Sequence, residues 1–305
     1  MVVPFGHDSV PSHDDAAAVV ARLRGRIAEE RRRAARAAEI AATYEEQSAA
    51  GPEHLRSLRT RMAVLHRQMQ TRHRTSAALH EVHAIRMEAW ADGRGTAFRP
   101  VFMSAVAAAM GVRSAAATLR GRRPAAVVTA ASDAVARAAY DLEVALGEGP
   151  ALTAMTAGVP VSAVGGSLPD RWPLYGPAIG ELGVRAVVAV PLRHAADCLG
   201  TLCAYSPAPV LPDRVVALAG RVADAVTYTM LLSPDLTADE GVRDEPLFAE
   251  SDYQAVVHQA AGMVAVQFGC GIDDAEHLLR ARAFADGQPV EEVALSVLRL
   301  QTRLD

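Results

Sequence analysis

The side chains best placed for chemistry lie near the C-terminus, in the stretch "HQAAGMVAVQFGCGIDDAEHLLRARAFADG" that begins at His258. After a turn at Gly269–Gly271, a helical pattern carries Arg280 and Arg282. The planar guanidinium of arginine suits recognition of phosphates and bases. Residues two apart on a helix point about 200° apart, so the two arginines cannot share one target. The pattern therefore predicts binding chemistry, with a solvated surface position as the alternative for each arginine.

The helix before that turn contains Gly262, directly after Ala260 and Ala261. Glycine inside a helix costs about 1 kcal/mol relative to alanine. This cost is tolerable where a second backbone must come close, because glycine has no side chain. That backbone could belong to a neighbouring helix or to a nucleic acid, and both interpretations remain open. His258 and Gln259 add polar groups beside it, again with solvated surface as the alternative.

The other reactive side chains predict structural roles. The cysteines are Cys198, Cys203 and Cys270; the odd count and the lack of a CxxC pair argue against a disulfide framework. Cys198 and Cys203 are five apart on a predicted strand, so they point to opposite faces. His194 lies in the polar turn "RHAAD" and is the only histidine between Gly95 and Leu232. We therefore expect a surface histidine rather than a haem ligand.

The sequence does not predict an enzyme. It contains no Ser/His/Asp set, no GxxxxGK loop and no metal-ligand cluster. The stretch "LHEVHAIRMEAW" offers His80 or His83 as a phosphoacceptor, but no ATP-binding domain accompanies it. We expect no catalysis, and the sequence names no cofactor.

Composition sets further limits. The 305 residues suit two domains with extensions, and half of them are hydrophobic. The chain has no lysine, so all 31 basic residues are arginine, and the net charge of −4 does not favour polyanion binding by charge alone. No apolar run reaches the roughly 18 residues of a membrane span, and the first residues do not resemble a signal peptide. We expect a cytoplasmic protein that does not enter a membrane.

Residues 1–92 are predicted to form a disordered tip followed by a helical arm. After the break at "AAGPE", Leu55, Leu58, Met62, Leu65 and Met69 alternate spacings of three and four. Such spacing is typical of a coiled-coil seam. The arm could pair between two chains as a dimerisation element, or fold into an antiparallel hairpin that packs on its own domain.

Residues 93–232 alternate helical and extended patterns, which indicates an α+β domain with an antiparallel sheet. Its motifs "LGEGPALTAMTAGVPV", "RWP", "LGVRAVVAVPL" and "CLGTLCAYS" resemble the GAF domains of actinobacterial regulators. The resemblance implies a cavity beside the sheet that holds a small molecule such as a cyclic nucleotide, haem or bilin. Trp172 near Tyr175 could stack on a planar ligand, or Trp172 could anchor a loop.

Residues 233–249 read as a polar, acidic linker, and residues 250–305 carry only helical patterns. There "QAAGM", "DDAEHLLRARA" and "VEEVALSV" resemble the ANTAR domain. The resemblance implies a three-helix bundle that binds paired RNA hairpins and prevents transcription termination. It makes His258, Gln259, Gly262, Arg280 and Arg282 the candidate RNA-binding residues, with Arg280 preferred.

The bundle's core is predicted from its apolar pattern. The small facing residues are Ala260, Ala275 and Ala294, and the filling residues are Val264, Leu278, Leu279, Val293 and Leu298, with Phe268 and Phe284 also inside. Two features depart from the family. Ala261 stands where many members have a basic residue, and from Tyr253 to Asp305 four arginines face seven acidic residues, a net charge of −3. An acidic unit is a poor electrostatic partner for RNA.

Together these patterns predict an α+β multidomain regulator with a helical or coiled-coil arm, a GAF sensor and an ANTAR bundle. We expect a homodimer that senses a signal and promotes antitermination on hairpin RNA of the nascent transcript. The alternative is a sensor or dimerisation protein that does not bind RNA and acts through protein partners.

Overall fold

The computed structural model describes residues 13–94, 100–120, 127–195, 197–232, 252–288 and 290–299. The predicted linker and most of the predicted disordered tip therefore lie outside the described residues. The chain divides into two compact units, Met1–Pro100 and Val101–Asp305, and each is described by itself. No described helix is long and apolar enough to cross a membrane.

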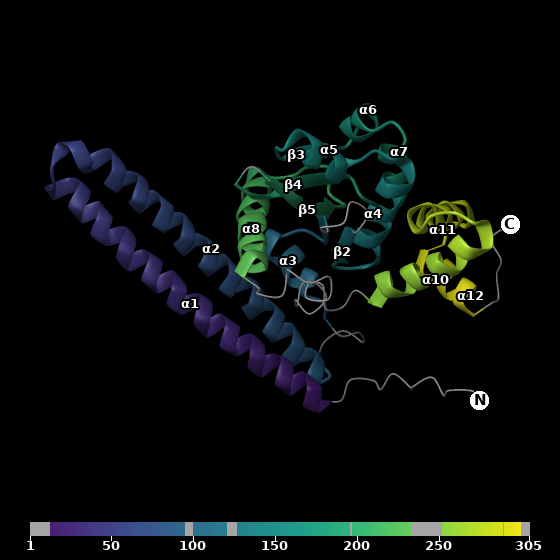
Figure 1. Cartoon of the computed structure of the whole chain (residues 1–305), viewed down its shortest axis with the longest axis horizontal. Helices are drawn as coiled ribbons and strands as arrows, with labels where there is room; N and C mark the ends of the chain where they lie inside the picture. The colour runs from purple at the N-terminus through teal and green to yellow at the C-terminus, as the bar shows by residue number, and fades with distance from the viewer. Residues whose placement is uncertain are drawn as a thin grey trace. The chain divides into compact units, whose positions relative to one another are not determined.

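The first unit is a helical hairpin (Figure 1). Helix α1 (His13–Ala50) and helix α2 (Glu53–Ala91) run antiparallel and pack along each other. Pro52 stands directly before α2, with φ at −59°, where its missing N–H costs nothing. Each helix is about 57 Å long at 1.5 Å per residue. Within one chain, the predicted arm therefore forms an antiparallel helical hairpin.

The predicted seam of α2 is not the seam that packs against α1. Leu58 and Leu65 are 50% and 43% exposed. The contacts with α1 come instead from a line one residue further along, in which His66 stacks on Tyr44 and Met87 packs into the apolar cluster of α1. Both lines have the same spacing of three and four. The second line fits because α1 faces it with small alanines at buried positions, which allow close approach.

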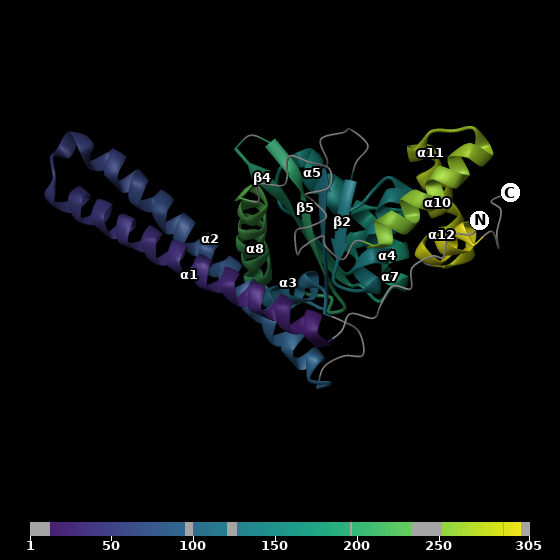
Figure 2. The same ribbon diagram turned by 60° about the horizontal axis from the view of Figure 1, so that its bottom comes forward.

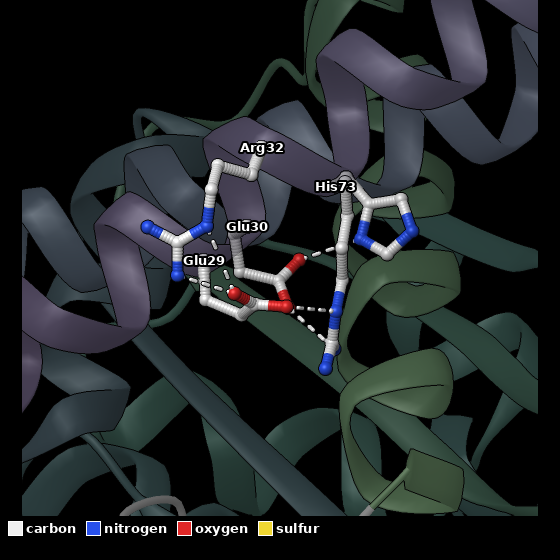
Figure 3. A network of polar contacts seen from close by, with 5 residues as sticks. Glu29, Glu30, Arg32 and His73 are labelled. Carbon is white, nitrogen blue, oxygen red and sulfur yellow. Dashed lines mark hydrogen bonds and ion pairs between the residues drawn. The ribbon is translucent and has the colours of Figure 1, made fainter.

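A buried hydrogen bond between the two helices lies inside the hairpin (Figure 3). Glu30 interrupts the apolar pattern of α1, and its Oε2 lies 2.7 Å from Nδ1 of His73, with both side chains buried. At the surface, Arg31 contacts Glu81 at 2.9 Å and Arg67 contacts Glu45 at 2.7 Å. Exposed pairs contribute little stability each. They join α1 to α2 at separate points, however, and so favour one antiparallel register.

His80 makes the hairpin sensitive to acid. Burial lowers the pKa of His80 to about 4, and the charges of Arg26 and His83 add to the effect. The pKa of His80 is therefore lower in the folded protein than in the unfolded chain, where it is near 6.5. The contribution of neutral His80 to hairpin stability is fully present above pH 6.5 and is lost as pH falls through 4. The difference corresponds to about 3 kcal/mol.

We expect His80→Leu to remove the contribution of His80 to the pH dependence of hairpin stability. Protection of the α2 amides from hydrogen exchange at pH 7.5 and pH 4 measures this stability. The exposed His54→Leu variant serves as the control and should behave as the wild type does. If His80→Leu and wild type lose protection equally on acidification, the assignment to His80 is wrong.

The second unit is built on a five-stranded antiparallel sheet with the strand order β2-β1-β5-β4-β3. The strands are β1 (Ser114–Arg120), β2 (Val127–Ala131), β3 (Val161–Val164), β4 (Ala186–His194) and β5 (Asp197–Ser206). Gly200 of β5 is opposite Leu119, and a Cβ there would lie 1.9 Å from the carbonyl oxygen of Thr118. Glycine is therefore required for this pairing, and the predicted antiparallel sheet is confirmed.

Helices cover both faces of the sheet (Figure 2). They are α3 (Phe102–Met110), α4 (Ala134–Leu146), α5 (Pro150–Ala157), α6 (Ser167–Arg171), α7 (Tyr175–Glu181) and α8 (Asp213–Leu232). Helices α4 to α7 share one core with alternate residues of the strands, while α3 and α8 pack on the other side. Asp133 caps α4 by accepting a hydrogen bond from the N–H of Ala136 at 2.9 Å. The short helices α6 and α7 were not predicted, because five and seven residues are too few to show a period.

The C-terminal part contains three helices around one core: α10 (Asp252–Phe268), α11 (Ile272–Asp286) and α12 (Val290–Leu298). The predicted small residues are buried, as are Val264, Leu279 and Val293, and Leu298 packs at the edge. Three core predictions are wrong: Leu278, Phe268 and Phe284 are 40%, 45% and 52% exposed. These three side chains lie outside the core, which consists mainly of alanine and valine with Leu279.

Candidate functional site

A cluster of protonatable side chains is buried between the sheet and its covering helices. It consists of Glu143 on α4, Tyr175 on α7, and Cys203 and Tyr205 on β5, and we call it the inner cluster. The charge of the Glu143 carboxylate raises the pKa values of the other three groups. All four side chains therefore lie close enough to interact electrostatically. Buried titratable groups of this kind mark candidate ligand sites.

Glu143 has one satisfied and one unsatisfied oxygen. Its Oε1 accepts a hydrogen bond from the N–H of Leu152 at 2.6 Å, in the first turn of α5. Its Oε2 is buried and has no hydrogen-bond partner among the described residues. Gly149 allows the approach, because a Cβ there would lie 2.5 Å from the Glu143 carboxyl carbon. A donor group on a ligand could satisfy this second oxygen.

The protonation states follow from burial. Burial raises the pKa of Glu143 to about 7, although N–H groups of Leu152 and Ala151 oppose the shift. Burial also raises the pKa of the Cys203 thiol and holds the pKa of Tyr205 well above its usual value. The thiol and phenol are therefore neutral, and Glu143 is the group that changes charge near neutral pH.

The predicted ligand residues divide between two roles. Tyr175 belongs to the inner cluster. Trp172 is buried, donates from Nε1 to Oγ1 of Thr153 at 3.0 Å, and meets Tyr175 edge-on with ring centroids 6.1 Å apart. The Arg171 guanidinium lies 5.5 Å from the Trp172 ring centre. These contacts support the loop-anchor interpretation of Trp172.

Sequence reasoning missed Glu143. The pattern did contain a signal, because Ala136 and Ala139 lie seven and four residues before it and place it on the buried side of α4. The surface position predicted for His194 is confirmed. Cys203 is buried, Cys198 is partly covered, and His194 is exposed at the end of β4.

The candidate RNA-binding residues of the bundle occupy different environments. His258 and Gln259 are exposed on α10, and Arg282 is partly buried, with its Nε 2.6 Å from Oδ2 of Asp286. A Cβ added at Gly262 would meet no described atom within 4 Å. Packing against a neighbouring helix of the bundle is therefore the wrong explanation for Gly262, and approach by an external backbone stays a prediction.

Arg280, the preferred candidate, is buried, with 9% of its surface exposed. Its Nη1 donates to Oε2 of Glu276 at 2.9 Å, and its Nε lies 3.7 Å from Oδ1 of Asp141 on α4. His258 also pairs with Glu276. Burial alone would raise the pKa of Glu276, but the hydrogen bond from His258 and the charge of Arg280 lower it to about 2. In this structure Arg280 is an internal ion-pair residue and faces away from solvent.

Comparison with known proteins identifies the sensor region. Residues 56–230, more than half of the chain, match the GAF domain family. A domain attributed to a two-component sensor histidine kinase protein from Sinorhizobium meliloti 1021 is similar at 16% identity, with a TM-score of 0.35, over 47% of this chain and 92% of that one. The GAF domain of Acinetobacter phosphoenolpyruvate-protein phosphotransferase is similar at 13% identity, with a TM-score of 0.31, over 54% and 96%.

A search of curated proteins finds no match. The family match begins at residue 56, inside α2, whereas the sequence pattern placed the start of the domain at residue 93. Helix α2 therefore belongs partly to the matched region. Because the match spans more than half of the chain, this protein belongs to the GAF domain family.

Proposed function

We propose that this protein is a signal-responsive regulator in which the GAF domain binds a small molecule and the C-terminal bundle binds paired RNA hairpins. Binding to the hairpins of a nascent transcript would prevent termination, and the protein would act as a homodimer without catalysing a reaction. The observation that carries the sensor role is Glu143, a buried carboxyl with one unpartnered oxygen in a GAF core.

Support for the RNA role comes from the bundle and its motifs. The resemblance to the ANTAR family rests on the motifs "QAAGM", "DDAEHLLRARA" and "VEEVALSV". Three helices share one core there, as the resemblance implies. On α10, Gln259, Gly262 and Val266 follow each other at spacings of three and four, so they share one outward face. This face is open at Gly262 and could approach a nucleic-acid backbone closely.

The test is RNA binding by the full-length protein at two salt concentrations, with a two-hairpin RNA and a scrambled control. Gln259→Ala and Arg282→Ala are the informative variants because both side chains reach solvent. We expect Arg282→Ala to weaken binding about tenfold and to reduce the dependence on salt, as the loss of one charged contact does. Arg113→Ala removes the same charge from an exposed position in the GAF domain and should bind as the wild type does. Equal, negligible binding to both RNAs by the wild type and by every variant, including Asp141→Asn, would exclude the RNA role.

A second candidate function is a sensor that acts through protein partners. The bundle exposes large apolar side chains, among them Val266 at 85% and Phe284 at 52%. Its net charge of −3, from the four arginines and seven acidic residues between Tyr253 and Asp305, also disfavours RNA. Exposed apolar side chains of this size favour a protein-binding surface. If the RNA experiment is negative, this candidate replaces the first.

A further inference from the structure

Helix α4 has two sides with different partners. Glu143 enters the inner cluster of the GAF domain, whereas Asp141 lies beside Arg280 of α11. Two residues apart on a helix correspond to about 200° of rotation, so these carboxylates point in nearly opposite directions. One helix therefore connects the candidate ligand site with the C-terminal bundle.

Arg280 lies between acidic groups from two parts of the chain. Glu276 comes from its own helix, one turn earlier, and Asp141 comes from the GAF domain. The side chains of Asp141 and Glu276 are only 16% and 18% exposed, so the charges of the pair are weakly screened. Tyr140, also on α4, is buried and lies near enough for Arg280 to influence its pKa. Arg280 is thus one point of contact between the bundle and the GAF domain.

The contact with Asp141 is suited to reversible breaking. The Nε of Arg280 is buried without a hydrogen bond in the described part of the chain, and it lies 3.7 Å from Asp141, beyond hydrogen-bond distance. The bond to Glu276, at 2.9 Å, does not depend on the GAF domain. If α4 moved, Arg280 would keep one carboxylate partner and the bundle would keep its core, which α10, α11 and α12 supply themselves.

We propose that α4 is a latch: Asp141 holds Arg280 and α11 against the GAF domain, and a ligand that donates a hydrogen bond to Glu143 shifts α4 and releases them. In the latched state Arg280 is hidden from any external partner. In the released state the Arg280 side of α11 is available to the partner of the bundle. The RNA part of this proposal and the ligand at Glu143 rest on the proposed function, whereas the contact of Asp141 with Arg280 does not.

The test is Asp141→Asn in the full-length protein, examined by hydrogen exchange and by binding to the two-hairpin RNA. This substitution removes the charge while keeping the shape of the side chain. We expect amides of α11 to exchange at least about fivefold faster and RNA to bind about fivefold more tightly, within the range of allosteric coupling. Asp141→Glu retains the charge and should restore slow exchange. Asp170→Asn, at an exposed position on α6, makes the same change away from Arg280 and should behave as the wild type does.

The outcomes separate the two proposals. Faster exchange in α11 with no RNA binding by any variant would support the latch and exclude the RNA role. RNA binding by the wild type, with exchange and affinity unchanged in Asp141→Asn, would overturn the latch and leave the RNA role intact. Faster exchange throughout the GAF sheet would show that Asp141→Asn unfolds the domain. The comparison of Asp141→Asn with Asp141→Glu would then decide: if α11 exchanged equally fast in both variants, the latch would be overturned.

Discussion

Replacing Arg280 with alanine is expected to destabilise the C-terminal bundle by about 3 kcal/mol, the lower end of the range for breaking a buried ion pair. The variant leaves Glu276 and Asp141 without their shared cation, and both carboxylates are largely removed from water. Glu276 would keep only its pair with His258, so the size of the effect comes from weaker compensation of the buried charges more than from the lost contact itself. Hydrogen exchange of the α10, α11 and α12 amides measures the change within the bundle, so that unfolding of the other parts does not obscure it.

Arg282→Ala is the matched control, because it removes the same side chain two residues away. Arg282 pairs with Asp286 on the same helix, with side chains 40% and 35% exposed. Exposed pairs of this kind contribute little, so the control should lose little protection. Equal loss in both variants would show that Arg280 is not an internal ion-pair residue.

Arg280→Ala is therefore a poor test of RNA contact. Loss of binding in Arg280→Ala would follow from loss of the bundle's structure even if Arg280 never touched RNA. Arg282→Ala and Gln259→Ala avoid this ambiguity, since neither side chain is buried. They are the variants that test direct contact.

The second large effect is expected from Glu143→Gln, which should remove most of the pH dependence of GAF-domain stability near neutrality. Burial raises the pKa of Glu143 to about 7 in the folded protein, from an ordinary value of 4.5. The folded state therefore holds the Glu143 proton more tightly than the unfolded chain does. The contribution of this proton to the stability of the GAF domain is fully present below pH 4.5 and is lost as pH rises through 7. The loss amounts to about 3 kcal/mol.

Glutamine keeps the carbonyl oxygen that accepts from Leu152 but cannot ionise. At pH 4 the variant should match the wild type, and at pH 8.5 it should be more stable by up to about 3 kcal/mol. Urea unfolding followed by Trp172 fluorescence in a Trp90→Phe background reports on the GAF core, where Trp172 is buried. Glu181→Gln, at an exposed position, should follow the wild type at both pH values. Parallel pH profiles for wild type and Glu143→Gln would show that Glu143 does not titrate in the folded domain near neutral pH.

Local patterns in the sequence were sufficient for the longer helices and for the antiparallel sheet, but not for the short helices α6 and α7. Each predicted strand has its own apolar run and polar turn, and Asp133, Pro150 and Gly111 mark helix ends by their own conformational preferences. The motifs of residues 98–232 were sufficient for the GAF assignment, which the family match confirms. These features depend on neighbours in the sequence, which is why the sequence predicts them.

The choice between equivalent faces was decided only by tertiary structure. Helix α2 has two lines with the spacing of a coiled-coil seam, one through Leu58 and Leu65 and one through His66 and His73. Periodicity cannot separate them, because they have the same period and differ by a single position. The partner helix decides: Tyr44 and Glu30 of α1 meet His66 and His73. Hydrophobicity alone would select the leucines.

The roles of the charged residues were also fixed by distant parts of the chain. Glutamate and arginine are usually exposed, so composition predicts a surface position for Glu143 and Arg280. Glu143 is buried because the first turn of α5 presents an N–H group to it, and Arg280 is buried because Asp141 lies against it from a helix 139 residues earlier in the sequence. A charge can be buried only where a partner offsets its lost hydration. The sequence determined which groups could serve in a site, and the tertiary structure decided which of them are paired, because pairing depends on residues brought together by the fold.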